Sequence, residues 1–412
     1  MKKILMVGMH DGYASMFRND RDLELYVLEE EALYKKNSAA YESYKPAGIL
    51  LTKYQQSDDF RAAALQWHRE IGFDAVAPAW EYGVHASGVL AETFGLRSPG
   101  RRALEACTDK LVLREMLSST SIRQPRWARV SSVDDVARFH RGTPIILKPS
   151  NRHASVGVIR VDDAAHIADA WQECVTANES RTVADRPRAV ELMVEEFVPG
   201  YQVSVETLVR DRKVVFDNVC LMLTAGGPYF PILSVTVPAP IPSHEYEAAV
   251  AASHSLVASL EVENGMIHSE WKVCDSHPYL IESAARVPGA FTPELAEKAY
   301  GGFNMYRAQV RNLAGLDPLL PGPERSIASV RWFHPPSGKL KAIHGADALE
   351  ADPAVFLRRI KIAQGDEVPV CRDGWHRIGY FAAHAPTKRE LDATVSRILE
   401  TVVFDMEPSA NS

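Results

Sequence analysis

The first hundred residues alternate strand-like with helix-like segments, and this alternation constrains the fold more than any other feature of the chain. Four short apolar runs are predicted strands: KKILMVG (2–8), LELYVLE (23–29), AGILLTK (47–53) and FDAVAPA (73–79). Helices are predicted over 58–72 and 82–95. Strands that alternate with helices form a parallel sheet wound with helices. An α/β domain is therefore predicted over 1–98, although GMHDGY is too loose a match to a dinucleotide fingerprint to indicate such a site.

A break at Pro99 and Gly100 ends the alternation, and one helix is predicted over 101–118. From Pro125 onward the chain is richer in strands, predicted at RWARV (126–130), TPIILKPS (143–150), VGVIRV (156–161), AVELMVEEFV (189–198), YQVSVETLV (201–209) and KVVFDNVCLML (213–223). Further helices are predicted over 164–175, 245–262 and 292–301. The Pro- and Gly-rich segment 226–243 is predicted to be a long loop near a site.

The last hundred residues are predicted to form a smaller strand-containing domain that ends in a helix over 386–402. A chain of 412 residues exceeds one hydrophobic core, so two or three domains are expected. The fold class predicted from these patterns is α/β and α+β multidomain.

Composition excludes several classes of partner. The net charge of -7, with no run of Lys or Arg, argues against nucleic acid or an anionic membrane as the main partner. No stretch of about 18 apolar residues predicts a membrane-spanning helix, and the start has no cleavage pattern of a secretory signal. The five cysteines are scattered without CxxC spacing, which favours reduced thiols in a cytoplasmic protein and disfavours a zinc site.

The segment HSEWKVCDSHPYLIESAAR (268–286) places two glutamates inside β-prone sequence. Its two halves flank the short turn CDSHP, which predicts a β-hairpin. A turn centred on Ser276 sets Glu270 directly opposite Glu282. Two unit charges about 5 Å apart, the spacing of cross-strand partners, repel by roughly 3 kcal/mol at an effective dielectric near 20. Mg²⁺ would remove this repulsion, because it binds carboxylate oxygens together with phosphate oxygens.

The hairpin alone leaves an alternative open, in which the glutamates lie on a solvated sheet face and pair with Lys272 or with neighbouring residues. Arg286 lies two residue pairs beyond Glu282 on the same face if the strand continues, where it is placed to clamp a phosphate.

Three further segments have both a functional and a structural interpretation. Lys148 precedes the loop SNRHASVGV (150–158), an arrangement suited to phosphate oxygens, although such a loop is more often a surface hairpin. The connector at 195–200 is suited to reading an adenine edge, or it is an ordinary link between strands. Lys110, in EACTDKLVLREML (105–117), binds phosphate or is simply a solvated helical lysine.

Taken in order, Lys110, Lys-Pro at 148–149, EEFVPG at 195–200, Glu270 and E-x-x-x-R at 282–286 resemble the ATP-grasp superfamily. The segment 73–117 resembles the passage that leads into that domain, and HRIGYFAAHAPTKREL (376–391) looks like the C-terminal subdomain of its biotin-carboxylase-like and L-amino acid ligase branches. ESAARVPGAF (282–291), with Gly289 after Arg286, is most similar to the L-amino acid ligases.

The resemblance implies an ATP-grasp fold in three parts. These are an N-terminal Rossmann-like domain (1–98), an ATP-grasp nucleotide-binding region (99–316) with a small subdomain at about 122–200, and a C-terminal subdomain (317–412).

The resemblance also implies roles for individual residues. The implied ATP-binding residues are Lys110 and Lys148 for phosphate, Ser155 and Gly157 in the adjoining loop, Glu195, Glu196, Phe197 and Val198 for adenine, and Gln202 at the ribose position. His268 joins them because it shares the strand face of Glu270. Glu270 and Glu282 would bind Mg²⁺, with Mn²⁺ as an alternative ion, and Arg286 would be the catalytic residue that steadies the phosphate or acyl phosphate. Ala284 departs from the family pattern, because many relatives have an Asn metal ligand there.

The activity implied is ATP-dependent conversion of a small carboxylate, first of all an amino acid, to an acyl phosphate that an amine then attacks to give an amide or dipeptide. The loops 150–157 and 224–242 would act as lids that exclude water. A formate-dependent transformylase or carboxylase-type enzyme and a non-catalytic nucleotide-binding protein are the alternatives. A homodimer is one expected assembly, since many relatives dimerise.

Overall fold

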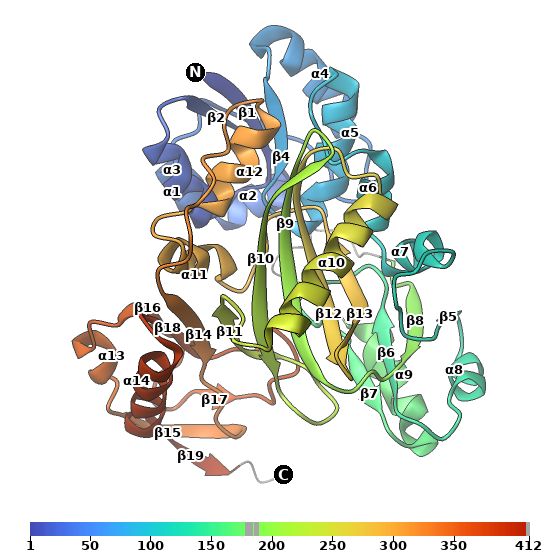
Figure 1. Cartoon of the computed structure of the whole chain (residues 1–412), viewed down its shortest axis with the longest axis vertical. Coiled ribbons are helices and arrows are strands. Elements are labelled where there is room, and N and C mark those ends of the chain that lie inside the picture. The colour runs from blue at the N-terminus through green and yellow to red at the C-terminus, as the bar shows by residue number, and fades with distance from the viewer. Residues whose placement is uncertain (178–183, 185–188, 409–412) are drawn as a thin grey trace.

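The computed structural model describes residues 1–177, 184 and 189–408 (Figure 1). The N-terminal region is a four-stranded parallel sheet in the order β3-β2-β1-β4. The strands are β1 (Lys2–Val7), β2 (Leu23–Glu29), β3 (Gly48–Leu51) and β4 (Ala75–Pro78). All four predicted strands are present, as are the predicted helices α4 (Phe60–Ile71) and α5 (Val84–Phe94). The α/β prediction for this region is confirmed.

Three helices in this region were not predicted: α1 (Asp11–Asn19), α2 (Glu31–Lys36) and α3 (Ser38–Tyr44). Helix α1 has a polar composition that resembles a loop, and its start is fixed by His10, whose Nδ1 accepts a hydrogen bond from Gly12 N. Short polar helices of this kind depend on tertiary packing, which local sequence does not record.

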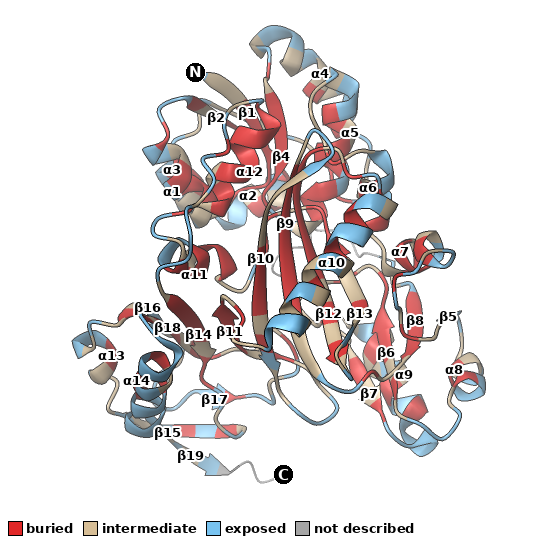
Figure 2. Ribbon diagram, viewed as in Figure 1, coloured by how far each residue is buried: buried red, intermediate tan, exposed pale blue. Residues whose placement is uncertain are grey.

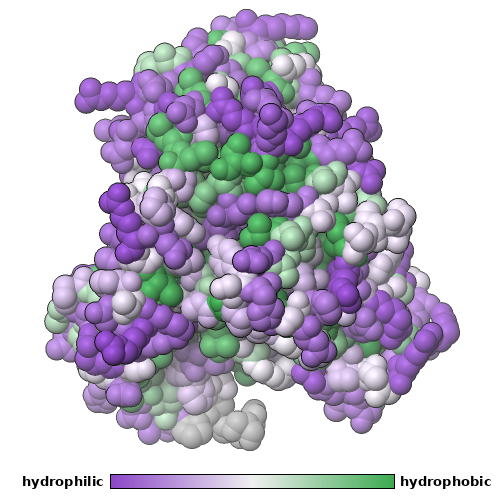
Figure 3. All heavy atoms as spheres, in the orientation of Figure 1, coloured by the Kyte–Doolittle hydropathy of each residue, from purple (hydrophilic) through white to green (hydrophobic). Residues whose placement is uncertain are grey.

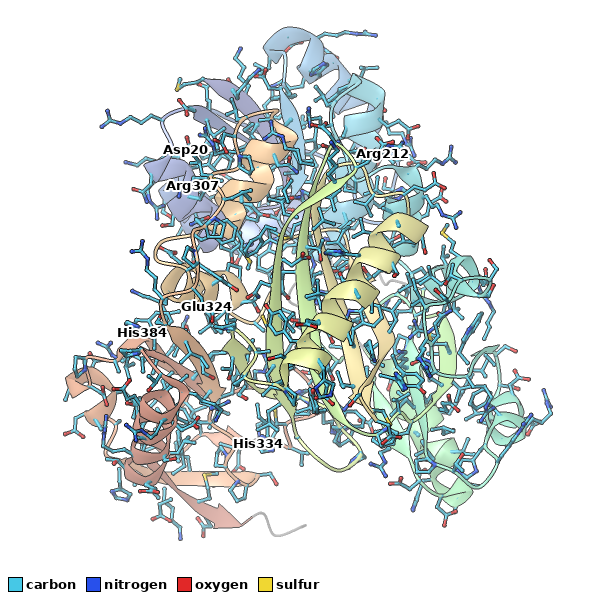
Figure 4. The ribbon with its side chains drawn as sticks, viewed as in Figure 1. Asp20, Arg212, Arg307, Glu324, His334 and His384 are labelled. Atoms are coloured by element: carbon cyan, nitrogen blue, oxygen red, sulfur yellow. The ribbon has the colours of Figure 1, made fainter. Side chains whose placement is uncertain are left out.

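A helix from much later in the chain packs on this sheet. Helix α12 (Met305–Leu313) lies beside β1 and β4 (Figure 1), and Met305 shares a buried cluster with Ile4 and Met6 of β1. Asp20, labelled in Figure 4, accepts two hydrogen bonds from Arg311 of α12. The N-terminal region is thus held to the rest of the molecule by both apolar packing and a buried ion pair.

An eight-stranded antiparallel sheet forms the centre of the molecule, in the order β13-β12-β9-β10-β11-β14-β18-β16. Its strands are β9 (Tyr201–Arg210), β10 (Lys213–Thr224), β11 (Ile232–Val237), β12 (Gly265–Cys274), β13 (His277–Ala284), β14 (Ile327–Trp332), β16 (Val355–Ile360) and β18 (Gly379–Ala385). Strand β11 comes before the domain boundary predicted between 316 and 317, and β14 comes after it. The two strands pair, so one sheet contains strands from both predicted regions.

Helix α10 (Ser243–Ser259) covers one face of this sheet (Figure 1). Val203, Val205 and Trp271 point to that side and share a buried cluster with Leu256 of α10. Figure 2 shows β9 and β12 buried while the outer side of α10 is exposed. Strand side chains alternate between the two faces, so Gln202, Ser204 and the two hairpin glutamates belong to the opposite face.

Two predictions of local structure were wrong. The helix predicted over 101–118 is two helices, α6 (Arg101–Ala106) and α7 (Lys110–Leu117), because the Asp109 carboxylate accepts hydrogen bonds from Leu111 N and Val112 N and starts a new helix there. The long loop predicted over 226–243 contains β11, paired with β10 and β14. Only 225–231 connects β10 to β11, so the predicted lid at 224–242 contains strand β11 as well as loop.

Two smaller sheets flank the central one (Figure 1). The first has the order β5-β8-β6-β7 and consists of β5 (Trp127–Val130), β6 (Ile145–Pro149), β7 (Ile159–Val161) and β8 (Leu192–Glu196), with α8 (Val133–Phe139) and α9 (Ile167–Thr176). The second is β17-β15-β19, formed by β15 (Gly338–His344), β17 (Glu367–Val368) and β19 (Val403–Pro408), with α13 (Ala348–Ala351) and α14 (Lys388–Thr401). The multidomain α/β and α+β class is confirmed.

The visible face of the molecule is mostly hydrophilic. Figure 3 shows apolar residues gathered in a band around α12 and the adjacent ends of β9 and β10. In the part of the chain that the structure describes, no helix combines the length and the apolar character that crossing a lipid bilayer requires.

Candidate functional site

The predicted hairpin is formed by β12 and β13, and its register places Glu270 opposite Glu282. The turn is Asp275–Ser276, both with positive φ (49° and 61°), as two-residue hairpin turns require. Its centre therefore lies between these residues and not on Ser276. A bulge next to Glu270 shifts the register by one residue and restores the predicted pairing. The pairing is confirmed, and the predicted turn centre was wrong.

Glu282 is held by Lys110, the first residue of α7. The Lys110 Nζ lies 2.9 Å from a Glu282 carboxylate oxygen and also donates to the Arg152 carbonyl at 2.7 Å. Burial by itself raises the pKa of Glu282, but Lys110 and other nearby cations outweigh burial and lower it below its usual range. Glu282 is thus a charged carboxylate. The Lys110 side chain is 13% exposed, which rules out the solvated alternative.

Both carboxylate oxygens of Glu270 accept hydrogen bonds. Nε2 of His268 lies 3.2 Å from Oε1, and Nε2 of Gln202 lies 2.6 Å from Oε2. The Glu270 side chain is 15% exposed, and Lys272 donates to the Gly200 carbonyl. The alternative of a solvated face with a Lys272 partner is therefore wrong.

A buried ion-pair triad lies beside the glutamates. Lys148, near the end of β6, places Nζ 2.6 Å from Glu195 Oε2, and Arg114 of α7 contacts Glu195 Oε1 at 2.8 Å. Burial lowers the pKa of Lys148, and the cations Arg114 and Lys110 lower it further against the opposing effect of Glu195. An anion brought to this lysine would reduce the free-energy cost of its charge.

Replacing Glu195 by Gln is expected to destabilise the protein by about 3–5 kcal/mol, because it leaves two buried cations without their shared counter-charge. Urea unfolding would measure the loss. Glu196→Gln is the matched control: Glu196 is 40% exposed at its side chain and lies 4.0 Å from Arg126, so its ion pair contributes about 1 kcal/mol or less. Equal stability of the two variants would contradict the structural role given to Glu195.

These groups line a cavity that encloses about 880 Å³ of empty space, including the open solvent at its mouth. The predicted residues that line it are Lys110, Lys148, Ser155, Glu195, Glu196, Phe197, Val198, Gln202, Glu270 and Glu282. The lining residues to which the sequence assigned no role in the site are Ile146, Arg152, Ala154, Val158, Phe230, Ile232, Lys272 and Ile281. Ile146 could have been found, since it is two residues before Lys148 on one strand and so shares its face.

Three predicted residues do not line this cavity. Gly157 has a φ of +70°, and a Cβ there would lie 2.8 Å from the Cβ of Ala177. The loop therefore needs a glycine at this position for its backbone conformation and its close packing. His268 lies behind Glu270; burial lowers its pKa, but hydrogen bonds to Glu206 and Glu270 raise it to about 9. Arg286 donates through Nε to Glu81 Oε2 at 2.5 Å.

A second cavity, of about 580 Å³, adjoins the first. Lys110, Arg152 and Glu282 line both cavities, whereas Glu81 and His85 of the N-terminal region line only the second. Its remaining lining residues are Tyr82, Ala106, Cys107, Thr108, Asp109, Leu113, Ser150, Asn151, His153, Ser283 and Ala284. The arrangement places a lysine and a carboxylate where a group bound in one cavity would meet a group bound in the other.

The donor set suits a hard divalent cation that also binds phosphate. Two facing carboxylates come from Glu270 and Glu282, and Ala284 adds no side-chain ligand. Among the described residues no group of three or more His, Cys, Asp or Glu side chains is arranged to hold a metal ion. A Mg²⁺ ion at this pair would take its other ligands from phosphate oxygens and water, as Mg²⁺ commonly does.

Comparison with protein families gives two matches. An ATP-grasp domain model matches residues 141–294, and the model of L-amino acid ligase C-terminal domain 2 matches residues 331–407. The first covers the strands that carry Lys148, Glu270 and Glu282. The second covers the region after the domain boundary that the sequence predicts at 317.

Individual relatives are distant. An uncharacterized protein of Sinorhizobium fredii is 25% identical over 78% of this chain, and an alanine–anticapsin ligase of Bacillus subtilis is 27% identical over 53% of it. The chain spans 66% of the length of the first and 49% of the second. The structure of an L-amino acid ligase from Bacillus licheniformis has the same fold, with a TM-score of 0.79, 18% identity and coverage of 99% of both chains.

Proposed function

Because the chain belongs to the ATP-grasp superfamily and is most like its L-amino acid ligase branch, we propose that it joins an amino acid to an amine in a reaction driven by ATP. The acid would be activated as an acyl phosphate, and the amine would displace phosphate to give an amide or dipeptide. The match to an ATP-grasp domain supports the general reaction of a carboxylate–amine ligase, and the amino acid specificity is the finer part of the proposal.

One observation carries the proposal: the two cavities meet at Lys110 and Glu282. Nucleotide in the larger cavity would direct its terminal phosphate toward a carboxylate in the smaller one. Phosphoryl transfer of this kind needs positioning and charge stabilisation more than a nucleophilic side chain. Lysines and carboxylates at a junction of two cavities supply both.

The proposed nucleotide contacts follow the cavity from its polar to its apolar end. Lys110 and Lys148 bind phosphate oxygens, with Ser155 and the loop turned by Gly157 beside them. Phe197 and Val198 form part of the apolar end, where the adenine ring would lie next to Glu196, and Gln202, which also lines the cavity, would contact the ribose. The structure adds a role to Glu195, whose carboxylate orients Lys148.

Mg²⁺ or Mn²⁺ bound by Glu270 and Glu282 would supply charge neutralisation on the phosphate oxygens. Lys110 has the complementary task of holding Glu282 in the position that the cation needs. Arg286, oriented by Glu81, is the proposed anchor for the phosphate or acyl phosphate. Burial lowers the pKa of its guanidinium, but Glu81 and the nearby carboxylates outweigh burial and raise it, so the group stays charged.

Arg286→Ala is expected to lower kcat at least tenfold, a loss of about 1.4 kcal/mol of transition-state stabilisation. The KM for ATP is expected to change by less than about threefold, because the missing interaction belongs to the reacting phosphate. Steady-state phosphate release measures both constants. Arg212→Ala, on an exposed ion pair with Glu263, is the control. An unchanged kcat in Arg286→Ala would reject this role.

The alternatives differ in what supports them. Purine-pathway synthetases share the fold, so a carboxylase-type or transformylase reaction remains the second candidate. The match to an L-amino acid ligase C-terminal domain favours the first. A non-catalytic nucleotide-binding protein is supported only by Ala284, whereas the charged pair and Arg286 are present.

The proposed partners are small-molecule acids and amines, with a homodimer as the proposed assembly. The cytoplasm is the proposed compartment, a view supported by the five cysteines, all of which are free thiols.

A screen of amino acid pairs for phosphate release, with product masses measured, tests the proposed function. We expect ADP and phosphate only when an acid and an amine are both present, together with a product whose mass equals their sum less one water. ATP binding without turnover across the screen would favour the non-catalytic alternative. Turnover that requires bicarbonate or formate would favour the second candidate.

A further inference from the structure

A buried carboxylate that the proposed reaction does not use lies next to the candidate metal site. Glu206 of β9 is fully buried, on the same sheet face as Glu270 and directly opposite His268 of β12. Its Oε1 accepts hydrogen bonds from Ser204 Oγ at 2.7 Å and His268 Nδ1 at 3.0 Å. Its Oε2 accepts from Asn218 Nδ2 at 2.7 Å and Cys220 Sγ at 3.1 Å.

His268 joins this carboxylate to Glu270. Its Nδ1 faces Glu206, and its Nε2 lies 3.2 Å from Glu270 Oε1. A carboxylate oxygen only accepts hydrogen bonds, so the imidazole donates from both nitrogens and bridges two carboxylates. The hydrogen bond from Nδ1–H to Glu206 fixes the imidazole ring in the orientation that points Nε2–H at Glu270. The other oxygen of Glu270 is held by Gln202 at 2.6 Å.

Burying the Glu206 carboxylate costs free energy of desolvation, which its hydrogen bonds have to offset. Replacing buried ion pairs by apolar side chains is often neutral or stabilising, so stability alone does not explain a glutamate in the centre of a sheet. Partners behind the ligands of a metal site orient those ligands and change metal affinity when they are removed.

We propose that Glu206 is a positioning residue of the metal site, which fixes His268 so that His268 and Gln202 together hold both carboxylate oxygens of Glu270 in the orientation that binds the cation. This inference rests on the proposed function, because it takes Glu270 as a metal ligand. Glu206 touches neither substrate nor cation, and its effect passes through His268.

The test measures metal binding directly. Glu206→Gln keeps the size of the side chain but changes the hydrogen bond to His268. We expect the dissociation constant of Mn²⁺ in the presence of ADP, read from the free Mn²⁺ signal in electron paramagnetic resonance, to rise about 10–100-fold. ADP binding without metal, measured by calorimetry, should stay within about twofold, since Glu206 lies outside the nucleotide cavity.

The chain supplies a matched control in Asp217, a second carboxylate hydrogen-bonded to a histidine. Asp217 of β10 contacts His254 Nε2 at 2.8 Å on the face covered by α10. Asp217→Asn should leave Mn²⁺ affinity at the wild-type value. An unchanged Mn²⁺ dissociation constant in Glu206→Gln, or an equal rise in Asp217→Asn, would overturn the inference.

A double variant separates positioning from a general structural effect. If Glu206 acts through His268, then His268→Gln alone weakens Mn²⁺ binding, and adding Glu206→Gln weakens it no further; independent, additive losses would contradict this. If Glu206→Gln fails to fold, His268→Gln still tests the link, and wild-type Mn²⁺ affinity in that variant would overturn it. Wild-type protein that binds ADP but no Mn²⁺ would instead contradict the proposed function.

Discussion

Glu282→Gln is expected to reduce turnover at least tenfold, which corresponds to about 1.4 kcal/mol of lost transition-state stabilisation. Two effects of the substitution act together. The cation loses one of two facing carboxylates, and Lys110 loses its ion pair, which leaves its hydrogen bond to the Arg152 carbonyl to hold it at the junction of the cavities. The loss should be larger at low Mg²⁺ concentration, because the remaining Glu270 binds the cation more weakly. Phosphate release measured across a Mg²⁺ titration would show both effects.

Glu263→Gln is the matched control for this variant, because Glu263 forms an exposed ion pair with Arg212 and lines neither cavity. It should retain wild-type turnover at every Mg²⁺ concentration. A Glu282→Gln variant with wild-type turnover and wild-type Mg²⁺ dependence would remove Glu282 from the metal site.

Lys148→Ala is expected to weaken ATP binding by about tenfold or more, because a hydrogen bond between charged groups contributes roughly 1.5–3 kcal/mol. Turnover at saturating ATP should fall less than affinity does, since the lysine holds phosphate in the ground state as well as in the transition state. Calorimetry with a non-hydrolysable ATP analogue measures the affinity.

Stability has to be checked in the same variant, because Lys148 also neutralises Glu195. Arg114 still contacts Glu195 after the substitution, so the protein should remain folded. Lys388→Ala, on an exposed pair with Asp392 of α14, controls for loss of a lysine. Unchanged nucleotide affinity in folded Lys148→Ala would show that this lysine serves the structure alone.

The parts of the fold that the sequence predicted are those with strong local patterns. The strands of the N-terminal sheet and four of the eight strands of the central sheet, β9, β10, β12 and β13, follow from short apolar runs between polar turns. The helix break at Asp109 and strand β11 were missed, because one depends on a capping side chain and the other lies between prolines that suggest a loop. The packing of α12 on β1 joins segments about 300 residues apart, which periodicity cannot reveal.

The part of the candidate site that could be predicted is the part fixed by the register of one hairpin. The pairing of Glu270 with Glu282 was predicted from hairpin geometry. The actual turn shifts the register by one residue relative to the predicted turn, and the bulge next to Glu270 shifts it back by one. The partners of these residues were not predictable. Arg114, Glu81 and Glu206 are ordinary charged residues in the sequence, and only the folded chain places them next to Glu195, Arg286 and His268.

The central claim is that Glu270 and Glu282 hold a divalent cation against the phosphates of a nucleotide bound in the larger cavity. A crystal structure of the protein with Mn²⁺ and ADP, with the metal located by its anomalous scattering, tests this claim most directly. We expect a Mn²⁺ peak ligated by both carboxylates and by phosphate oxygens, with Lys148 on the same phosphates. A peak bound to neither carboxylate, or ADP lying outside this cavity, would contradict it.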